Sequence, residues 1–135
     1  MILFIEDDVD DVLATVTHFR RLAFTPEMVV VHDGLEAWEY LQESPALPRP
    51  LPALIMTDIK MPRLDGLELL GRLKGSSRLK DIPVVVLSSS TRQSDAAAAL
   101  DLGAALYLQK PFSADGYAGL VKTLKDLLTR GGIPG

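Results

Sequence analysis

Five polar side chains stand at the ends of short apolar segments of the chain: Glu6, Asp7, Asp58, Ser88 and Lys110. Together they offer three carboxylates, one hydroxyl and one amine. In an open parallel α/β sheet, ligands bind outside the carboxyl ends of the strands. If the apolar segments are parallel strands, these five side chains converge at one edge of the sheet although they are far apart in the sequence.

Asp58 is the centre of this predicted site, because it follows an apolar segment and precedes a loop that leads into a helical pattern. A single Asp at the end of a strand is commonly a helix cap. Here Glu6 and Asp7 leave a segment that we expect to lie beside it, and clustered carboxylates repel one another unless a hard cation with oxygen ligands neutralises them. The simplest such ion is Mg²⁺, which also neutralises phosphoryl oxygens during transfer to a carboxylate. Asp58 could then accept a phosphoryl group.

Ser88 and Lys110 suit the same chemistry. A fixed ammonium and a hydroxyl donor match the remaining oxygens of a phosphoryl group on Asp58. Taken singly, a Ser at a strand end is commonly a cap and most Lys side chains are solvated. It is the combination of five such residues in this order that favours a site.

The elements that must position these residues repeat five times as a strand followed by a helix. We predict strands at 2–5, 28–32, 53–57, 84–87 and 105–109, and helices over 12–22, 35–41, 67–74, 96–102 and 113–129. The strands are uniformly apolar, as expected where helices cover both faces of a sheet. The pattern predicts an α/β, flavodoxin-like (βα)5 fold, doubly wound around a five-stranded parallel sheet of order 2-1-3-4-5.

The chain of 135 residues fits one domain. We expect that domain to span 1–130, followed by a short flexible tail at 131–135 and no output domain. Residues 44–52 contain four prolines, which bar a helix and suit a stiff extended connection. We interpret this segment as a spacer, with partner docking as the alternative.

Composition excludes several classes of protein. With 47% hydrophobic and 24% charged residues the chain is typical of soluble globular proteins. No apolar stretch approaches the roughly 18 residues of a membrane span, and the start lacks the features of a signal peptide, so we expect a cytoplasmic protein. The absence of cysteine excludes disulfides and thiolate metal sites. A net charge of −4 gives no electrostatic reason to bind nucleic acid directly.

At these motifs the chain resembles the receiver domains of two-component response regulators, over essentially its whole length. The matching stretches are Ile5-Glu6-Asp7-Asp8, Asp58-Ile59-Lys60-Met61-Pro62 with Asp65-Gly66, Leu87-Ser88 and Lys110-Pro111-Phe112. The resemblance implies that a sensor histidine kinase or phosphotransfer protein phosphorylates Asp58. It further implies that Mg²⁺ is bound by Asp7, Asp58, the Lys60 carbonyl and, through water, Glu6.

The resemblance also implies how the signal leaves the site. Ser88 and Lys110 would contact the phosphoryl group, and Tyr107, three residues before the lysine, would change rotamer together with Ser88. The surface formed by 96–102, 105–109 and 113–129 would then signal or form a homodimer. Four alanines at 96–99 would permit close approach by a partner, or simply favour a helix. Such a protein is a switch and not an enzyme, since it promotes only its own phosphorylation and dephosphorylation.

Several alternatives stay open on the sequence alone. The chain could be a phosphate sink or phosphorelay intermediate without a target, or a binding module that works without phosphorylation. The doubled acids near Asp10 and Asp11, with the proline-containing segment, resemble regulators paired with phytochrome-type kinases; the same acids also suit a first helical turn. A haloacid-dehalogenase-type hydrolase needs a second Asp where Lys60 stands, and a flavodoxin-type FMN carrier needs phosphate donors where the acids following Ile5 would repel the phosphate.

Overall fold

Strands and helices alternate along the chain as predicted. The computed structural model describes residues 1–42, 50–89 and 92–131. Within them the strands are β1 Ile2–Ile5, β2 Met28–Val31, β3 Leu54–Thr57, β4 Val84–Ser88 and β5 Leu106–Gln109. The helices are α1 Val9–Arg21, α2 Gly34–Leu41, α3 Gly66–Lys74, α4 Gln93–Asp101 and α5 Ala114–Gly131.

The five strands form one parallel sheet of order β2-β1-β3-β4-β5. This confirms the predicted flavodoxin-like α/β fold and its topology. The strand register decides what meets at the open edge. Ile5 pairs with Thr57, so the residues that follow them, Glu6 and Asp58, leave the sheet side by side. Ser88 pairs with Gln109, which brings Lys110 beside the end of β4.

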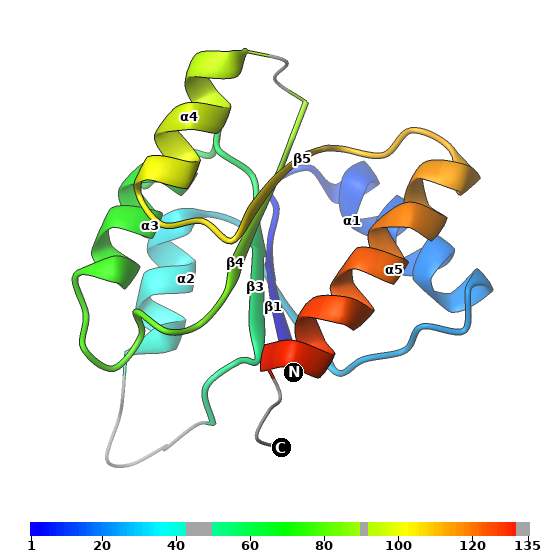
Figure 1. Ribbon diagram of the computed structural model, residues 1–135, viewed down its shortest axis with the longest axis horizontal. Coiled ribbons are helices and arrows are strands. Elements are labelled where there is room, and N and C mark those ends of the chain that lie inside the picture. The colour runs from blue at the N-terminus through cyan, green and yellow to red at the C-terminus, as the bar shows by residue number, and fades with distance from the viewer. Residues whose placement is uncertain (43–49, 90–91, 132–135) are drawn as a thin grey trace.

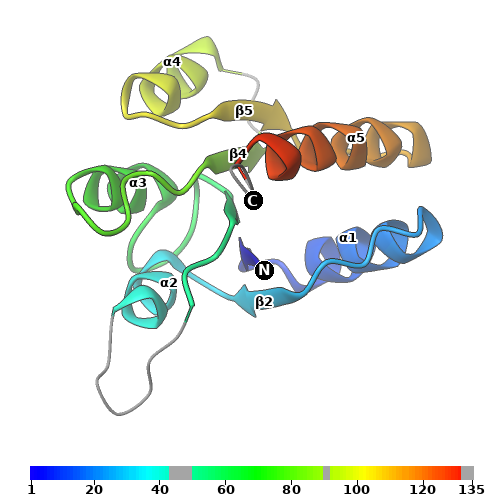
Figure 2. The same ribbon diagram turned by 60° about the horizontal axis from the view of Figure 1, so that its bottom comes forward.

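Helices cover both faces of the sheet. Figures 1 and 2 show α2, α3 and α4 on one face and α1 and α5 on the other. Side chains of β1 alternate between the two layers: Leu3 and Ile5 belong to the core cluster that includes residues of α2 and α3, and Ile2 and Phe4 to the cluster with α1 and α5. Because both faces are covered, every residue of β1 and β3 is buried, which explains their continuous apolar sequence.

Aspartates fix the starts of three helices at the same edge of the sheet. Asp8, Asp33 and Asp65 are the N-caps of α1, α2 and α3, and each side chain accepts hydrogen bonds from backbone N–H groups of the first turn. These bonds satisfy donors that have no partner inside the helix. Asp10 and Asp11 lie in the first turn of α1, where negative charge interacts favourably with the helix dipole, as one of the two interpretations of these acids predicted.

Some boundaries differ from the prediction. The fourth helix begins at Gln93, three residues before its alanine run, and α5 continues to Gly131, so the first residue of the predicted tail is helical. The rest of that tail, 132–135, and most of the proline-containing segment, 44–49, lie outside the described residues. In the described part of the chain, no helix combines the length and apolarity needed to cross a membrane.

Candidate functional site

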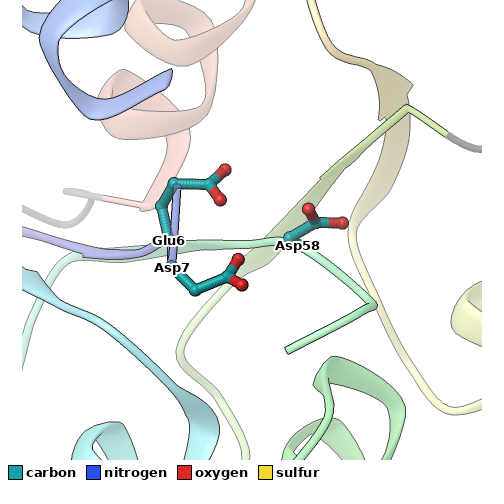
Figure 3. Close-up of side chains that lie close together, drawn as sticks. All are labelled: Glu6, Asp7 and Asp58. Atoms are coloured by element: carbon teal, nitrogen blue, oxygen red, sulfur yellow. The ribbon is translucent and has the colours of Figure 1, made fainter. Parts of the chain in front are cut away.

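Three of the predicted carboxylates meet at the carboxyl ends of β1 and β3. One ligand oxygen from each of Glu6, Asp7 and Asp58 lies within 4.8 Å of the others, and Figure 3 shows the three side chains close together. Glu6 and Asp58 are buried, whereas Asp7 is exposed. A cluster of carboxylate oxygens with one open side fits a hard divalent cation, so this is an acidic metal-binding cluster.

The Lys110 ammonium joins this cluster. Its Nζ lies 2.8 Å from Glu6 Oε1, from Asp58 Oδ2 and from Asp11 Oδ2. The Lys110 backbone N–H donates to the Ser88 carbonyl at 2.9 Å, which ties the end of β5 to β4. Burial alone would lower the pKa of Lys110, but the hydrogen bonds to Asp11, Asp58 and Glu6 outweigh it and raise that pKa. The side chain is therefore a fixed cation at neutral pH.

The carboxylates are crowded despite this cation. Burial raises the pKa of Glu6, and the negative charge of Asp58 raises it further. The bond from Lys110 and the Asp8 backbone N–H, which donates to Glu6 Oε2 at 3.1 Å, only partly oppose the rise. A further positive charge at the cluster would relieve this repulsion, which is the electrostatic reason to expect a metal ion.

The loop between β3 and α3 is folded tightly around Asp58. Asp58 Oδ1 accepts the Ile59 N–H at 2.6 Å, and the Gly66 N–H donates to the Ile59 carbonyl at 2.7 Å. A Cβ on Gly66 would lie 2.1 Å from the Asp58 carbonyl oxygen, so only glycine permits this approach. Lys60 is exposed and lines, together with Asp7, an open depression beside the carboxylates.

A second open depression, of about 570 Å³, gives access to Asp58 and Lys110. Its lining combines acidic residues from β1, α1 and β3 with the ends of β4 and β5: Glu6, Asp7, Asp8, Asp11, Asp58, Ser89, Gln109, Lys110, Pro111 and Phe112. A small anion or a partner's side chain can therefore reach the Asp58 carboxylate from solvent.

The comparisons with known proteins agree with this geometry. A family model described as the response regulator receiver domain matches residues 2–122. The chain belongs to the response regulator receiver domain family. Receiver domains act in two-component phosphorelays with a histidine kinase as partner, and they are not conventional enzymes. This membership also excludes the hydrolase and flavin-carrier alternatives.

Several relatives match the receiver domain over most of its length. The probable methanogenesis regulatory protein FilR2 of Methanothrix harundinacea is 35% identical over 126 residues, covering 93% of this chain and 81% of FilR2. The Mn²⁺-bound structure of response regulator Rcp1 has a TM-score of 0.78 at 31% identity, covering 92% and 90% of the two chains. The phosphorylated cyanobacterial phytochrome response regulator RcpA has a TM-score of 0.82 at 32% identity, covering 95% and 92%. The receiver domain spans about half the length of other relatives, such as Rre1 of Synechocystis.

The predicted switch residues of the receiver domain occupy neighbouring strands. Val86 pairs with Tyr107, and Ser88 lies two residues further along β4, so Ser88 and Tyr107 project from the same face of the sheet. Ser88 is 2% exposed, and Tyr107 packs partly buried against the core on the side of α2 and α3. Ser89 is the serine that lines the depression above Asp58. The contact of Ser88 with a phosphoryl group stays a prediction.

Sequence reasoning missed Asp11 as a site residue. From the sequence, Asp11 is assigned to the first helical turn and to the doubled acids that resemble phytochrome-paired regulators, whereas in the structure its carboxylate also pairs with Lys110. The available signal was its place four residues after Asp7, in the first turn of the helix that follows β1. That turn lies over the carboxyl end of the sheet, where the other acids gather.

Proposed function

We propose that this receiver domain accepts a phosphoryl group on Asp58 from a sensor histidine kinase or phosphotransfer protein. The observation that carries the proposal is the placement of the Asp58 carboxylate. It opens to a depression reachable from solvent, it belongs to the metal-binding cluster with Glu6 and Asp7, and it lies 2.8 Å from the Lys110 ammonium. These are a nucleophile and the positive charge that a phosphoryl transfer needs, arranged around one carboxylate.

In the proposed transfer, a carboxylate oxygen of Asp58 forms a bond to phosphorus. The bond between phosphorus and the imidazole nitrogen of the donor histidine breaks, and the imidazole leaves with the electron pair. Lys110 and Ser88 bind oxygens of the transferred group. Asp7, Asp58, the Lys60 carbonyl and, through water, Glu6 would hold the metal, which we assign as Mg²⁺ and whose charge would neutralise phosphoryl oxygens.

Phosphorylation would then change the face formed by α4, β5 and α5. The new group adds a charge of roughly −1.5 to −2, which draws the Ser88 hydroxyl toward it and leaves space for the Tyr107 ring. Apolar side chains are exposed at the end of α4, where Leu100 is 49% and its C-cap Leu102 39% exposed. We propose that this surface binds a target or a second copy of the chain in the phosphorylated state.

Exposed apolar side chains near the depression suit a protein partner. Phe112, which lines it, is 91% exposed, and Val9 and Leu13, one turn apart on α1, are 62% and 60% exposed. A kinase or phosphotransfer protein docking here would cover this apolar surface while presenting its histidine to Asp58. We place this phosphotransfer in the cytoplasm, where ATP is available to the kinase.

The likeness to RcpA, described as a cyanobacterial phytochrome response regulator, and to the bacteriophytochrome response regulator AtBRR favours a phytochrome-type kinase as the donor. AtBRR has a TM-score of 0.76 at 36% identity and covers 93% of this chain. Phosphotransfer from a panel of purified kinases, with and without a phytochrome photosensor, tests this assignment. Preferential transfer from a kinase without such a sensor would contradict it.

Incubation with acetyl phosphate and Mg²⁺ tests the proposed function. The wild type should gain the mass of one phosphoryl group, and the gain should disappear with EDTA or in Asp58→Asn. Asp10→Asn is the matched control, because it removes an acidic residue that lies outside both the carboxylate cluster and the depression. Labelling that persists in Asp58→Asn, or a folded wild type that is never labelled, would contradict the proposal.

A further inference from the structure

The Lys110 ammonium is shared by three carboxylates that lie at different depths. The side chain of Glu6 is 2% exposed, that of Asp58 10% and that of Asp11 41%. All three oxygens are 2.8 Å from Nζ. Asp11 is therefore the outermost partner and holds the ammonium at the solvent side of the cluster.

The start of α1 fixes Asp11 in this place. The Asp8 side chain accepts the N–H of Asp10 at 2.9 Å and of Asp11 at 3.3 Å, which closes the first turn over the strand ends. Asp8, Asp11 and Asp58 line the same depression. A phosphodonor that enters this depression to reach Asp58 therefore comes close to the Asp11 carboxylate.

We propose that Asp11 is a positioning residue that holds Lys110 at the mouth of the site and selects against small, highly charged phosphodonors. The inference rests on the proposed phosphorylation of Asp58. The carboxylate of Asp11 weakens the electrostatic attraction between Lys110 and a phosphoryl oxygen, and it repels an incoming anion directly. A protein donor offsets this repulsion with contacts outside the depression, whereas a small donor has none.

Repulsion by one fixed charge scales with the charge of the donor, and this gives a signature that a structural role of Asp11 would not produce. Acetyl phosphate is a dianion near neutral pH. Phosphoramidate, whose nitrogen is protonated, carries one net negative charge. In both reactions an Asp58 oxygen bonds to phosphorus. The bond from phosphorus to the leaving oxygen or nitrogen breaks, and acetate or ammonia departs with the electron pair.

The test compares second-order phosphorylation rates of Asp11→Asn and wild type with both donors, at saturating Mg²⁺ and low ionic strength. Asp11→Asn should increase the rate of phosphorylation by acetyl phosphate about fivefold and the rate with phosphoramidate about twofold. Higher salt should reduce both factors. Asp10→Asn removes a charge from the same turn, but Asp10 is not among the described residues that line the depression. It should change both rates by a factor close to one.

Several results would overturn the role of Asp11. These are equal acceleration of the two donors, slower reaction with both, or the same acceleration in Asp10→Asn. Asp11→Ser supplies a second neutral variant in case the amide variant folds poorly. A wild type that takes up phosphate from neither donor would remove the proposed function, and the role of Asp11 with it. A labelled wild type with an unchanged Asp11→Asn would remove the role of Asp11 alone.

Discussion

The Lys110 ammonium lies 2.8 Å from the Asp58 carboxylate, and the same nitrogen contacts Glu6 at 2.8 Å. One cation from the end of β5 thus balances acids from the ends of β3 and β1. Glu6 is almost completely buried, so its charge depends on this contact more than a surface carboxylate would. Lys110 is therefore a structural counter-ion as well as a candidate phosphoryl ligand.

Replacing Lys110 with Met should destabilise the protein by about 2 kcal/mol at pH 7 in EDTA, because two close carboxylates lose their cation. This loss of stability should be smaller at pH 5. The folded-state pKa of Glu6 is already raised, and without Lys110 it rises further, so the folded protein takes up a proton as pH falls and the repulsion disappears. Urea unfolding at both pH values measures the two losses.

Lys60→Met is the matched control for this experiment, since Lys60 is an exposed lysine at the same edge of the sheet. It should change the unfolding free energy little at either pH. An equal loss for Lys110→Met at pH 7 and pH 5 would show that packing, and not charge balance, explains the effect.

The two glycines of α3 should respond in opposite ways to alanine. At Gly66 a Cβ would lie 2.1 Å from the Asp58 carbonyl oxygen and 2.9 Å from Ile59 Cα, so the loop carrying Asp58 must shift. We expect Gly66→Ala to cost about 2 kcal/mol and to slow phosphorylation. A Cβ on Gly71 would meet no atom from outside its own helix turn within 4 Å in the described part of the chain, and Gly71→Ala should stabilise by about 0.5 kcal/mol. Chemical denaturation measures the free energy of unfolding of both variants. Similar values for the two would contradict the close contact between Gly66 and the Asp58 carbonyl.

The loop after Asp58 is also held by Arg63, which has a φ of +68° and whose Nε donates to Asp33 Oδ2 at 2.8 Å. Arg63→Ala and Arg63→Gly both lose this ion pair, but only glycine accepts the left-handed backbone without strain. The glycine variant should therefore melt roughly 3 °C above the alanine variant. Thermal unfolding followed by circular dichroism provides the comparison. An alanine variant more stable than the glycine variant would contradict backbone strain at position 63.

The same pair predicts an acid dependence. Burial acts to raise the pKa of Asp33, but hydrogen bonds from Arg63 and the Glu36 N–H, with the charge of Arg63, outweigh it and lower that pKa. A carboxylate with a lowered pKa stabilises the fold above its unfolded pKa of about 3.9, and the contribution is lost as pH falls below that value. The difference in unfolding free energy between wild type and Arg63→Gly should therefore become smaller in acid. A difference that stays constant down to the acid transition would exclude the ion pair as its cause.

The switch assigned to Ser88 and Tyr107 should be visible in tyrosine ring resonances. Mg²⁺ with beryllofluoride, a mimic of the phosphoryl group, should shift Tyr107 more than Tyr40 or the buried Tyr117, which stacks on His18. Ser88→Ala should remove most of the Tyr107 shift.

Ser89→Ala is the control for this measurement, because Ser89 is the neighbouring hydroxyl and lines the depression. It should leave the Tyr107 shift in place. If Ser89→Ala removes the shift and Ser88→Ala keeps it, the switch hydroxyl belongs to Ser89.

The predictable part of this site follows from strand ends. Continuous apolar strands indicated a sheet covered on both faces, and parallel topology then placed Glu6, Asp58 and Lys110 together without any knowledge of distances. Asp11 and the pair between Arg63 and Asp33 could not be found this way. Their contacts depend on how far a side chain reaches from a helix turn and on a left-handed residue in a loop, and neither leaves a periodic signal in the sequence.

The central claim is that Asp58 is the residue that carries the phosphoryl group, and the most direct measurement locates that group. After reaction with acetyl phosphate and Mg²⁺, borohydride reduces an aspartyl phosphate to homoserine, which peptide mass spectrometry can place in the sequence. We predict homoserine at position 58 and unchanged aspartate at Asp7 and Asp11. Homoserine at either of those positions, or at none, would contradict the account.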